Sequence, residues 1–276
     1  MSAAAPAANA ERRPFVAPAR GDVLAATFTH PLFDDLVACR DLLLAAEWPG
    51  IDLLNTRLPL PGRRFVAQDE ALLADGLHYE VRVAQGRIAT RPGNWHDLFN
   101  ALVWARHPAL KAALNARQCL HVADRDDGQR NRAQQALTQF DESGVIVRVR
   151  EASLLDAWDR HDWSGLFRGH ADSWRRGDIA VIAVIGHALL EQALLPGRRL
   201  VGKCVVVARD AAVETDVARV VAAIRNGEVL EDPRELRPLP LAGIPGWHPQ
   251  QDAGFYADAD YFRPLREGRA YPPPLF

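Results

Sequence analysis

The stretch "DIAVIAVIGHALLEQALLPG", residues 178–197, decides the fold. Its residues 179–185 carry no polar side chain and are rich in β-branched types, which predicts a buried strand. Because seven such residues must be covered on both faces, we expect the strand to lie in the centre of a sheet. Gly186 then makes a tight junction, and the helix that follows ends at Pro196-Gly197. This order of elements predicts helices packed on a sheet.

Two side chains in this stretch carry chemistry. His187 opens the predicted helix and Glu191 follows one turn later, so both lie on the same helix face. This is a spacing at which two side chains can bind one metal ion or share one proton. The alternative is a local hydrogen bond between His187 and Glu191 on the helix surface. The HxxxE motif is weak evidence for a metal site, because it is frequent by chance.

The stretch "NWHDLFNALVW", residues 94–104, places polar residues in an apolar segment. The pattern predicts a helix over 95–106, with His96 and Asn100 on one narrow polar stripe. A surface helix normally offers Glu, Lys or Arg on its polar face, and none occurs here before Arg106. We therefore expect His96 and Asn100 to line a concave pocket. The alternative is a core helix whose polar groups are satisfied by neighbours.

Three acidic residues near these segments are further candidates. Asn94 is a good N-cap, and Asp97 lies where a capping-box partner would stand. Asp141 and Glu142 lie in a predicted helix-to-strand turn, in "LTQFDESG". Acidic residues in turns often bind only the local backbone, but these two precede a buried strand and can point inward.

The rest of the chain predicts an α+β fold, with mixed α/β as the alternative. We expect helices on a small mixed sheet that includes an antiparallel hairpin, in one domain over 21–276. Residues 1–20 are predicted to be a disordered leader, and residues 233–276 an irregular wrap rich in proline and aromatic residues. Further helices are predicted from Pro31 to Pro49 and at 108–117, 131–140, the first half of 154–167, and 213–226. Further strands are predicted at 145–149 and 202–208, with the hairpin formed by strands 79–83 and 87–91.

Composition restricts the partners. The 276 residues carry a formal net charge of −2. The chain therefore lacks the overall positive charge that is typical of nucleic-acid-binding proteins. No run approaches the roughly 18 apolar residues of a membrane span. Cys39, Cys119 and Cys204 are scattered and odd in number, which favours reduced thiols in the cytoplasm. No GxGxxG follows a strand and no GxxxxGK[ST] occurs, so the usual nucleotide-phosphate cradles are absent. None of these features sets the oligomeric state.

Five blocks resemble those of a known family: "TRPGNWHDLFNALVWARHPALKAALN", "ALTQFDESG", "GHALLE", "PLPLAGIPGW" and "FYADADYFRP". The chain is similar, over roughly residues 28–265, to a proteobacterial family catalogued only as a domain of unknown function, number three thousand and twenty-five. The resemblance implies that the blocks form one unit, but it implies no activity. The family pattern has an aspartate where this chain has Gln135. If that aspartate were essential, this chain would be impaired or would use Asp141 instead.

A second similarity is to HNH-type endonucleases, in which a hairpin and a helix clamp one metal over a phosphodiester. A general-base histidine would be expected soon after "LN", but Ala116 stands there and His121 is the nearest substitute. This departure makes an HNH-like nuclease a minor alternative.

Two hypotheses remain. The first is a metal-assisted hydrolase-type enzyme that acts on a small or phosphate-containing substrate. Its candidate residues are the metal ligands His96, His187 and Glu191, and the catalytic residues Asp97, Asn100, Asp141 and Glu142. Imidazole and carboxylate ligands suit zinc, iron or manganese. The second hypothesis is a non-catalytic binding or assembly protein in which these residues are polar struts.

Overall fold

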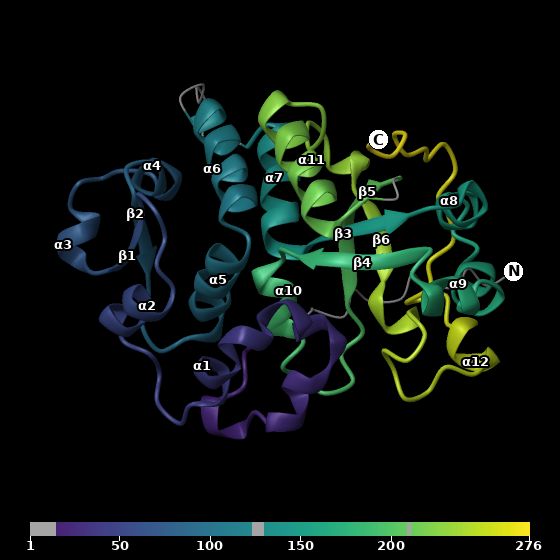
Figure 1. Ribbon diagram of the computed structural model, residues 1–276, viewed down its shortest axis with the longest axis horizontal. Helices are drawn as coiled ribbons and strands as arrows, with labels where there is room; N and C mark the ends of the chain where they lie inside the picture. Colours follow the sequence, from purple (N-terminus) through teal and green to yellow (C-terminus); the bar gives the residue numbers. More distant parts are fainter. Residues whose placement is uncertain (1–14, 123–129, 209–210) are drawn as a thin grey trace, which may run out of the picture.

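The four-stranded sheet organises the larger part of the molecule. The computed structural model describes residues 15–122, 130–208 and 211–276 (Figure 1). The strands are β3 Gly144–Val149, β4 Ile179–Val184, β5 Val201–Val207 and β6 Arg237–Pro240, in the order β4-β3-β5-β6. β3 runs antiparallel to β4 and parallel to β5, and β5 runs antiparallel to β6. The α+β fold with a mixed sheet is therefore confirmed.

The strand at 179–185 forms, but its predicted central place is wrong. β4 lies at an edge of the sheet, and the fully buried β3 takes the central position beside it. Residues 180–182 are only half-buried. The carboxylate of Asp35 accepts a hydrogen bond from the Val184 backbone N–H at 3.0 Å. A side chain thus satisfies one of the polar groups that an edge strand leaves unpaired.

The predicted antiparallel hairpin at 79–91 is also wrong. Residues Tyr79–Ala84 form the helix α4, and β2 Arg87–Thr90 pairs in parallel with β1 Arg64–Ala67. The His78 ring accepts the Glu80 backbone N–H at the start of α4. Five residues of alternating polarity are too few to distinguish a strand from a short helix. The packing of this segment against α6 Pro108–Val122 therefore determines that it is helical. The HNH-like alternative loses the hairpin on which it depended.

The observed helices agree with the sequence-based predictions better than the strands do. Residues Trp95–Arg106 form α5 with the predicted bounds, and Asn94 caps it through the Asp97 backbone N–H. The segment after Pro31 is helical but forms a 3-10 helix as far as Cys39. The other α-helices are α1 Arg40–Leu44, α2 Ile51–Arg57, α3 Glu70–Leu73, α6 Pro108–Val122, α7 Arg132–Ser143, α8 Ala152–Asp159, α9 Ala171–Arg176, α10 His187–Gln192, α11 Val213–Asn226 and α12 Ala253–Tyr256. Helical segments of other types are η1 Arg20–Asp22, η2 Ala25–Thr29, η3 Pro31–Cys39, η4 Gly165–Gly169, η5 Pro233–Glu235 and η6 Leu241–Gly243. None of the described helices is long and apolar enough to cross a membrane.

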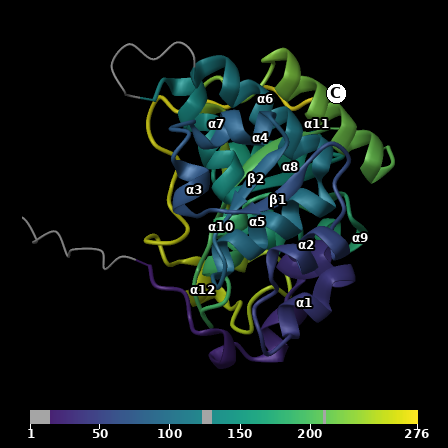
Figure 2. The same cartoon turned by 90° about the vertical axis from the view of Figure 1, so that its left-hand side faces the viewer.

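The central helices connect the two sheets. Figures 1 and 2 show α5, α6 and α7 between the two-stranded sheet and the four-stranded sheet. α7 packs on β3 and β5, while α5 packs against α10. The buried apolar side chains form one continuous cluster from the N-terminal segment to the C-terminal segment. Because α5 covers α10 rather than the sheet, His96 and His187 approach each other across a helix pair.

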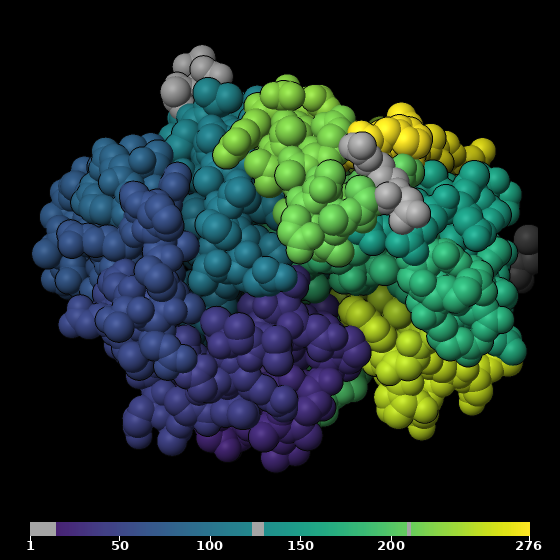
Figure 3. Space-filling model, in the orientation of Figure 1, coloured from purple at the N-terminus to yellow at the C-terminus, as the bar shows by residue number. Residues whose placement is uncertain are grey.

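Both terminal segments pack on this body. Residues 1–14 of the predicted leader lie outside the described residues, and residues 15–20 contact the body of the protein. The Trp95 indole donates to the Pro18 carbonyl, and Arg20 donates to the carbonyls of Leu42 and Ala45. Residues 233–276 are more regular than predicted, since they supply β6 and α12. In Figure 3 the N-terminal and C-terminal segments cover the lower part of the visible face.

Candidate functional site

A cavity of about 290 Å³ opens between the central helices. As the sequence predicts, His96 and Asn100 both line it. They lie one turn apart on α5 and share the cavity with polar residues of four other helices, α4, α6, α7 and α10. The wall includes Lys111 and Asn115 of α6, Asp141 and Glu142 of α7, and His187 of α10. The cavity therefore combines residues from all three stretches that carry the predicted site residues, 94–104, 137–144 and 178–197.

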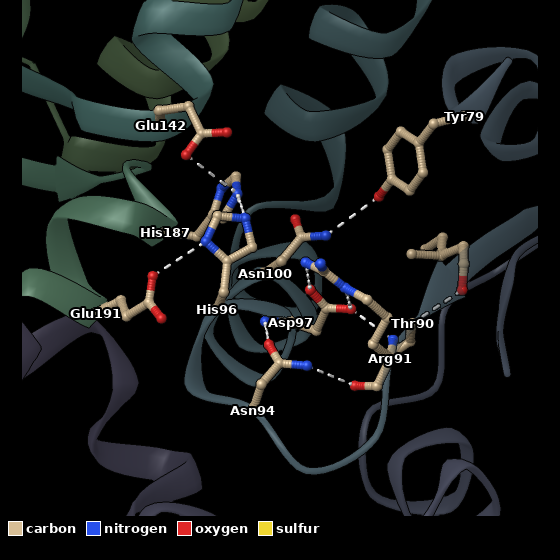
Figure 4. A network of polar contacts seen from close by, with 11 residues as sticks. Tyr79, Thr90, Arg91, Asn94, His96, Asp97, Asn100, Glu142, His187 and Glu191 are labelled. Atoms are coloured by element: carbon tan, nitrogen blue, oxygen red, sulfur yellow. Dashed lines mark hydrogen bonds and ion pairs between the residues drawn. The ribbon is translucent and has the colours of Figure 1, made fainter. Parts of the chain in front are cut away.

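His96 and His187 meet at one end of this cavity. Their Nε2 atoms are 3.2 Å apart and the ring planes are inclined by 74° (Figure 4). Ligand bonds of about 2.0–2.1 Å around a tetrahedral zinc place two imidazole nitrogens roughly 3.3 Å apart. The observed separation thus matches the spacing of two ligands of one metal ion. The pair also forms a hydrogen bond when one of the facing nitrogens carries a proton.

Glu142 completes a cluster with the two histidines. Its Oε2 atom lies 3.7 Å from His187 Nε2, and one ligand atom from each of the three residues lies within 4.8 Å of the other two. The Glu142 side chain is 39 % exposed, so it can move by a small rotation. Two imidazoles and one carboxylate are a ligand set that catalytic zinc sites use, with a further position left for water or substrate.

Glu191 lies behind this cluster instead of inside it. Its carboxylate accepts a hydrogen bond from His96 Nδ1 at 3.2 Å, on the opposite side of the ring from Nε2 (Figure 4). This bond raises the pKa of His96 and directs Nε2 toward His187. Glu191, predicted as a metal ligand beside His187, is not among the three described residues whose ligand atoms cluster, and it contacts His96 instead. Glu191 thus orients a histidine ring on another helix, an arrangement that is common around metal-binding histidines.

His187 is held in a neutral state. Burial lowers the pKa of His187 to about 3, against the opposing effect of Asp141. Asp141 Oδ2 lies 3.9 Å from His187 Nδ1, and Asp141 Oδ1 accepts a hydrogen bond from Lys111 Nζ at 2.5 Å. Burial acts to raise the pKa of Asp141, but the charge and hydrogen bond of Lys111, together with smaller effects of His187 and His96, keep that pKa below its usual value. A neutral imidazole is the form that binds metals.

Asp97 has a structural role. Its carboxylate accepts hydrogen bonds from the Arg91 backbone N–H at 2.5 Å and from the Arg91 guanidinium at 2.8 Å. Asp97 therefore anchors the loop before α5 and does not join the histidine cluster. The capping box predicted for Asp97 does not form, because the carboxylate binds Arg91 instead.

Asn100 lies next to the cluster. Its amide nitrogen donates to the Tyr79 hydroxyl at 3.1 Å, which orients the amide (Figure 4). Its carbonyl oxygen is buried and has no hydrogen-bond partner among the described residues. A buried acceptor without a partner is rare in folded proteins and calls for a water, an ion or a ligand group.

Lys111 and Glu80 are two charged residues of the cavity that were not predicted from the sequence. Lys111 is 4 % exposed and is one of only two lysines in this arginine-rich chain. Its place one turn before Asn115, in the otherwise apolar segment 108–115, was the available signal. Glu80 was hidden by the wrong strand prediction. Its Oε2 atom accepts a hydrogen bond from Asn115 Nδ2 at 2.7 Å.

Glu80 makes the stability of the protein depend on pH. Burial raises its pKa to about 6, while the bond from Asn115 and the charges of Lys111 and Arg130 oppose the effect and the charge of Asp141 adds to it. A carboxyl whose pKa is raised on folding loses stability as the pH rises from about 4.5 to about 6, by about 2 kcal/mol in all. The free energy of unfolding of Glu80→Gln minus that of the wild type should therefore increase by about 2 kcal/mol between pH 4.5 and pH 8. Urea unfolding at both pH values measures this. The exposed Glu70→Gln should show no such change, and a pH-independent difference for Glu80→Gln would contradict the assignment.

Gly186 sets the position of His187. A Cβ atom at residue 186 would lie 2.5 Å from Ser143 Cα, so α10 starts in direct contact with the end of α7. Backbone atoms cannot yield as a flexible side chain does. We expect Gly186→Ala to lower the free energy of unfolding by about 2 kcal/mol. Gly169→Ala, where nothing lies within 4 Å of the added Cβ, is the control. Equal stabilities of the two variants in urea would show that the contact at Gly186 is unimportant.

The geometry defines an α+β protein with two histidines and a carboxylate clustered at the wall of a cavity. The family follows from comparison: the model described as "Protein of unknown function (DUF3025)" matches residues 63–266, and the chain belongs to this family. The resemblance seen in the sequence blocks is thereby confirmed. No curated protein and no solved structure shows a significant match. Gln135 is exposed on α7 and lies outside the cavity lining.

Proposed function

We propose that this protein is a metal-dependent enzyme of the hydrolase type that acts on a small substrate. The observation that carries the proposal is the cluster of His96, His187 and Glu142, whose ligand atoms lie within 4.8 Å of one another at the wall of a cavity. Zinc, iron and manganese all accept this ligand set. The three free thiols suit a reduced cytoplasm.

Each residue of the cluster has a distinct task. His96 and His187 bind the metal through Nε2, and Glu142 turns its carboxylate toward the same point. Glu191 holds the His96 ring, while Asp141, fixed by Lys111, lies against the far nitrogen of His187. A bound divalent ion lowers the pKa of a coordinated water toward neutrality. Asn100 offers its carbonyl oxygen as a hydrogen-bond acceptor on the same wall.

The small size of the cavity restricts the substrate. About 290 Å³ lies just below the usual range of ligand pockets, roughly 300–1,000 Å³. A polymer could enter only with one terminal group. We therefore favour a metabolite-sized substrate.

A non-catalytic binding protein is the second candidate, and a direct contact favours it. The histidine rings touch at 3.2 Å and can form a hydrogen bond to each other, as in a polar strut. The two functions differ in their response to metal. An enzyme should contain close to one equivalent of a divalent metal when purified without a histidine tag. It should also hydrolyse a member of a panel of small amides, esters and phosphate esters, lose this activity with a chelator and regain it with one metal. Substoichiometric metal in every preparation, with no chelator-sensitive hydrolysis, favours the strut.

A further inference from the structure

Glu80 differs from the other acids that line the cavity. Asp97 and Asp141 are paired with the charges of Arg91 and Lys111, and Glu142 faces the histidines. The direct partner of the Glu80 carboxylate is instead the neutral amide of Asn115, which is itself 4 % exposed.

The surroundings of Glu80 favour a positive ligand group. Lys111 and Arg130 act on this carboxylate only over a longer distance, because no ion pair within 4 Å joins Glu80 to any described residue. A largely buried carboxylate without a close counter-charge costs free energy, which a bound cation would recover. The second carboxylate oxygen, Oε1, has no hydrogen-bond partner among the described residues. The Asn115 amide uses only its nitrogen toward Glu80, so its carbonyl oxygen is a second acceptor.

We propose that Glu80 and Asn115 form a subsite for the ammonium group of a small, amine-bearing substrate whose reacting end reaches His96 and His187. An ammonium group carries three donors and no acceptor, which matches the oxygens offered here. An anionic group at this place would be repelled by the Glu80 carboxylate. The link to the histidines rests on the proposed function, since both ends lie in the same cavity.

Matched pairs of hydroxamic acids test the subsite. Hydroxamates bind divalent metals, so the zinc-loaded protein would be titrated calorimetrically with ω-aminoalkyl hydroxamates of two to five methylenes. Each is compared with the alkyl hydroxamate of the same length. For at least one length, we expect the wild type to bind the amine roughly tenfold more tightly than its alkyl partner, because a hydrogen bond between charged groups is lost in the latter. In Glu80→Gln this preference should fall to about one, while Glu70→Gln should keep it.

The outcomes separate the two proposals. Zinc-dependent binding of all hydroxamates with no amine preference at any length would overturn the subsite and leave the metal centre intact. If no hydroxamate binds, the metal centre fails, and the subsite is tested in the metal-free protein by titration with n-butylamine and n-butanol. Binding of n-butylamine at pH 8 that Glu80→Gln weakens by roughly tenfold supports the subsite. Equal affinities of wild type and Glu80→Gln for n-butylamine would overturn it.

Discussion

Replacing His187 by alanine should reduce the affinity of the protein for zinc by at least about a hundredfold, because one of three ligands is removed. His96→Ala should do the same. The double variant should lose little more than either single variant, since two ligands of one ion act as a unit. Competition with a chromophoric chelator measures the affinities.

His107→Ala is the matched control for these variants. His107 is buried and follows α5, but it binds Asp35 at 3.1 Å and does not line the cavity. Its loss should lower stability without changing zinc affinity. Additive losses in the double variant, or an unchanged affinity in either single variant, would mean that His96 and His187 do not share a metal.

The second large effect is expected at Lys111. Lys111→Met should destabilise the protein by about 3 kcal/mol, because Asp141 is left as an unpaired carboxylate beside His187. This is at the lower end of the range for broken buried pairs, since the Asp141 side chain is 27 % exposed to the cavity. Adding Asp141→Leu to Lys111→Met should restore much of the loss. Chemical unfolding at pH 7 measures all three chains.

An exposed ion pair provides the comparison for Lys111. The side chains of Arg57 and Asp41 are 45 % and 52 % exposed, so Arg57→Met should cost less than about 1 kcal/mol. If Lys111→Met were no more costly than Arg57→Met, the charge of Lys111 would not be needed to hold Asp141 in place.

Helical periodicity and capping predicted much of the fold. The bounds of α5 follow from Asn94 and from the apolar pattern after it, and both signals lie within one segment. The position of β4 in the sheet does not follow from its sequence. An apolar run indicates that a strand is buried, but it does not indicate whether neighbouring strands or helices bury it. The helix α4 was missed because its first five residues also alternate in polarity.

The site was predictable only in part, because its residues meet across elements distant in the chain. His96 and His187 are separated by 91 positions and meet where α5 packs on α10. Glu142 and Asp141 are neighbours in the last turn of α7, about 100° apart around the helix. Only the rotation of α7 decides which one faces the metal position and which one faces Lys111. The roles of Glu191 and Asp97 likewise depend on partners outside their own segments.

The measurement that tests the metal centre most directly is an anomalous difference map from crystals of the full chain grown with one equivalent of zinc. Data collected on both sides of the zinc absorption edge identify the metal. We expect one peak within about 2.3 Å of the Nε2 atoms of both His96 and His187, with the Glu142 carboxylate turned toward it. Zinc bound elsewhere, or histidines that keep their direct 3.2 Å contact with no peak between them and the cavity, would contradict it.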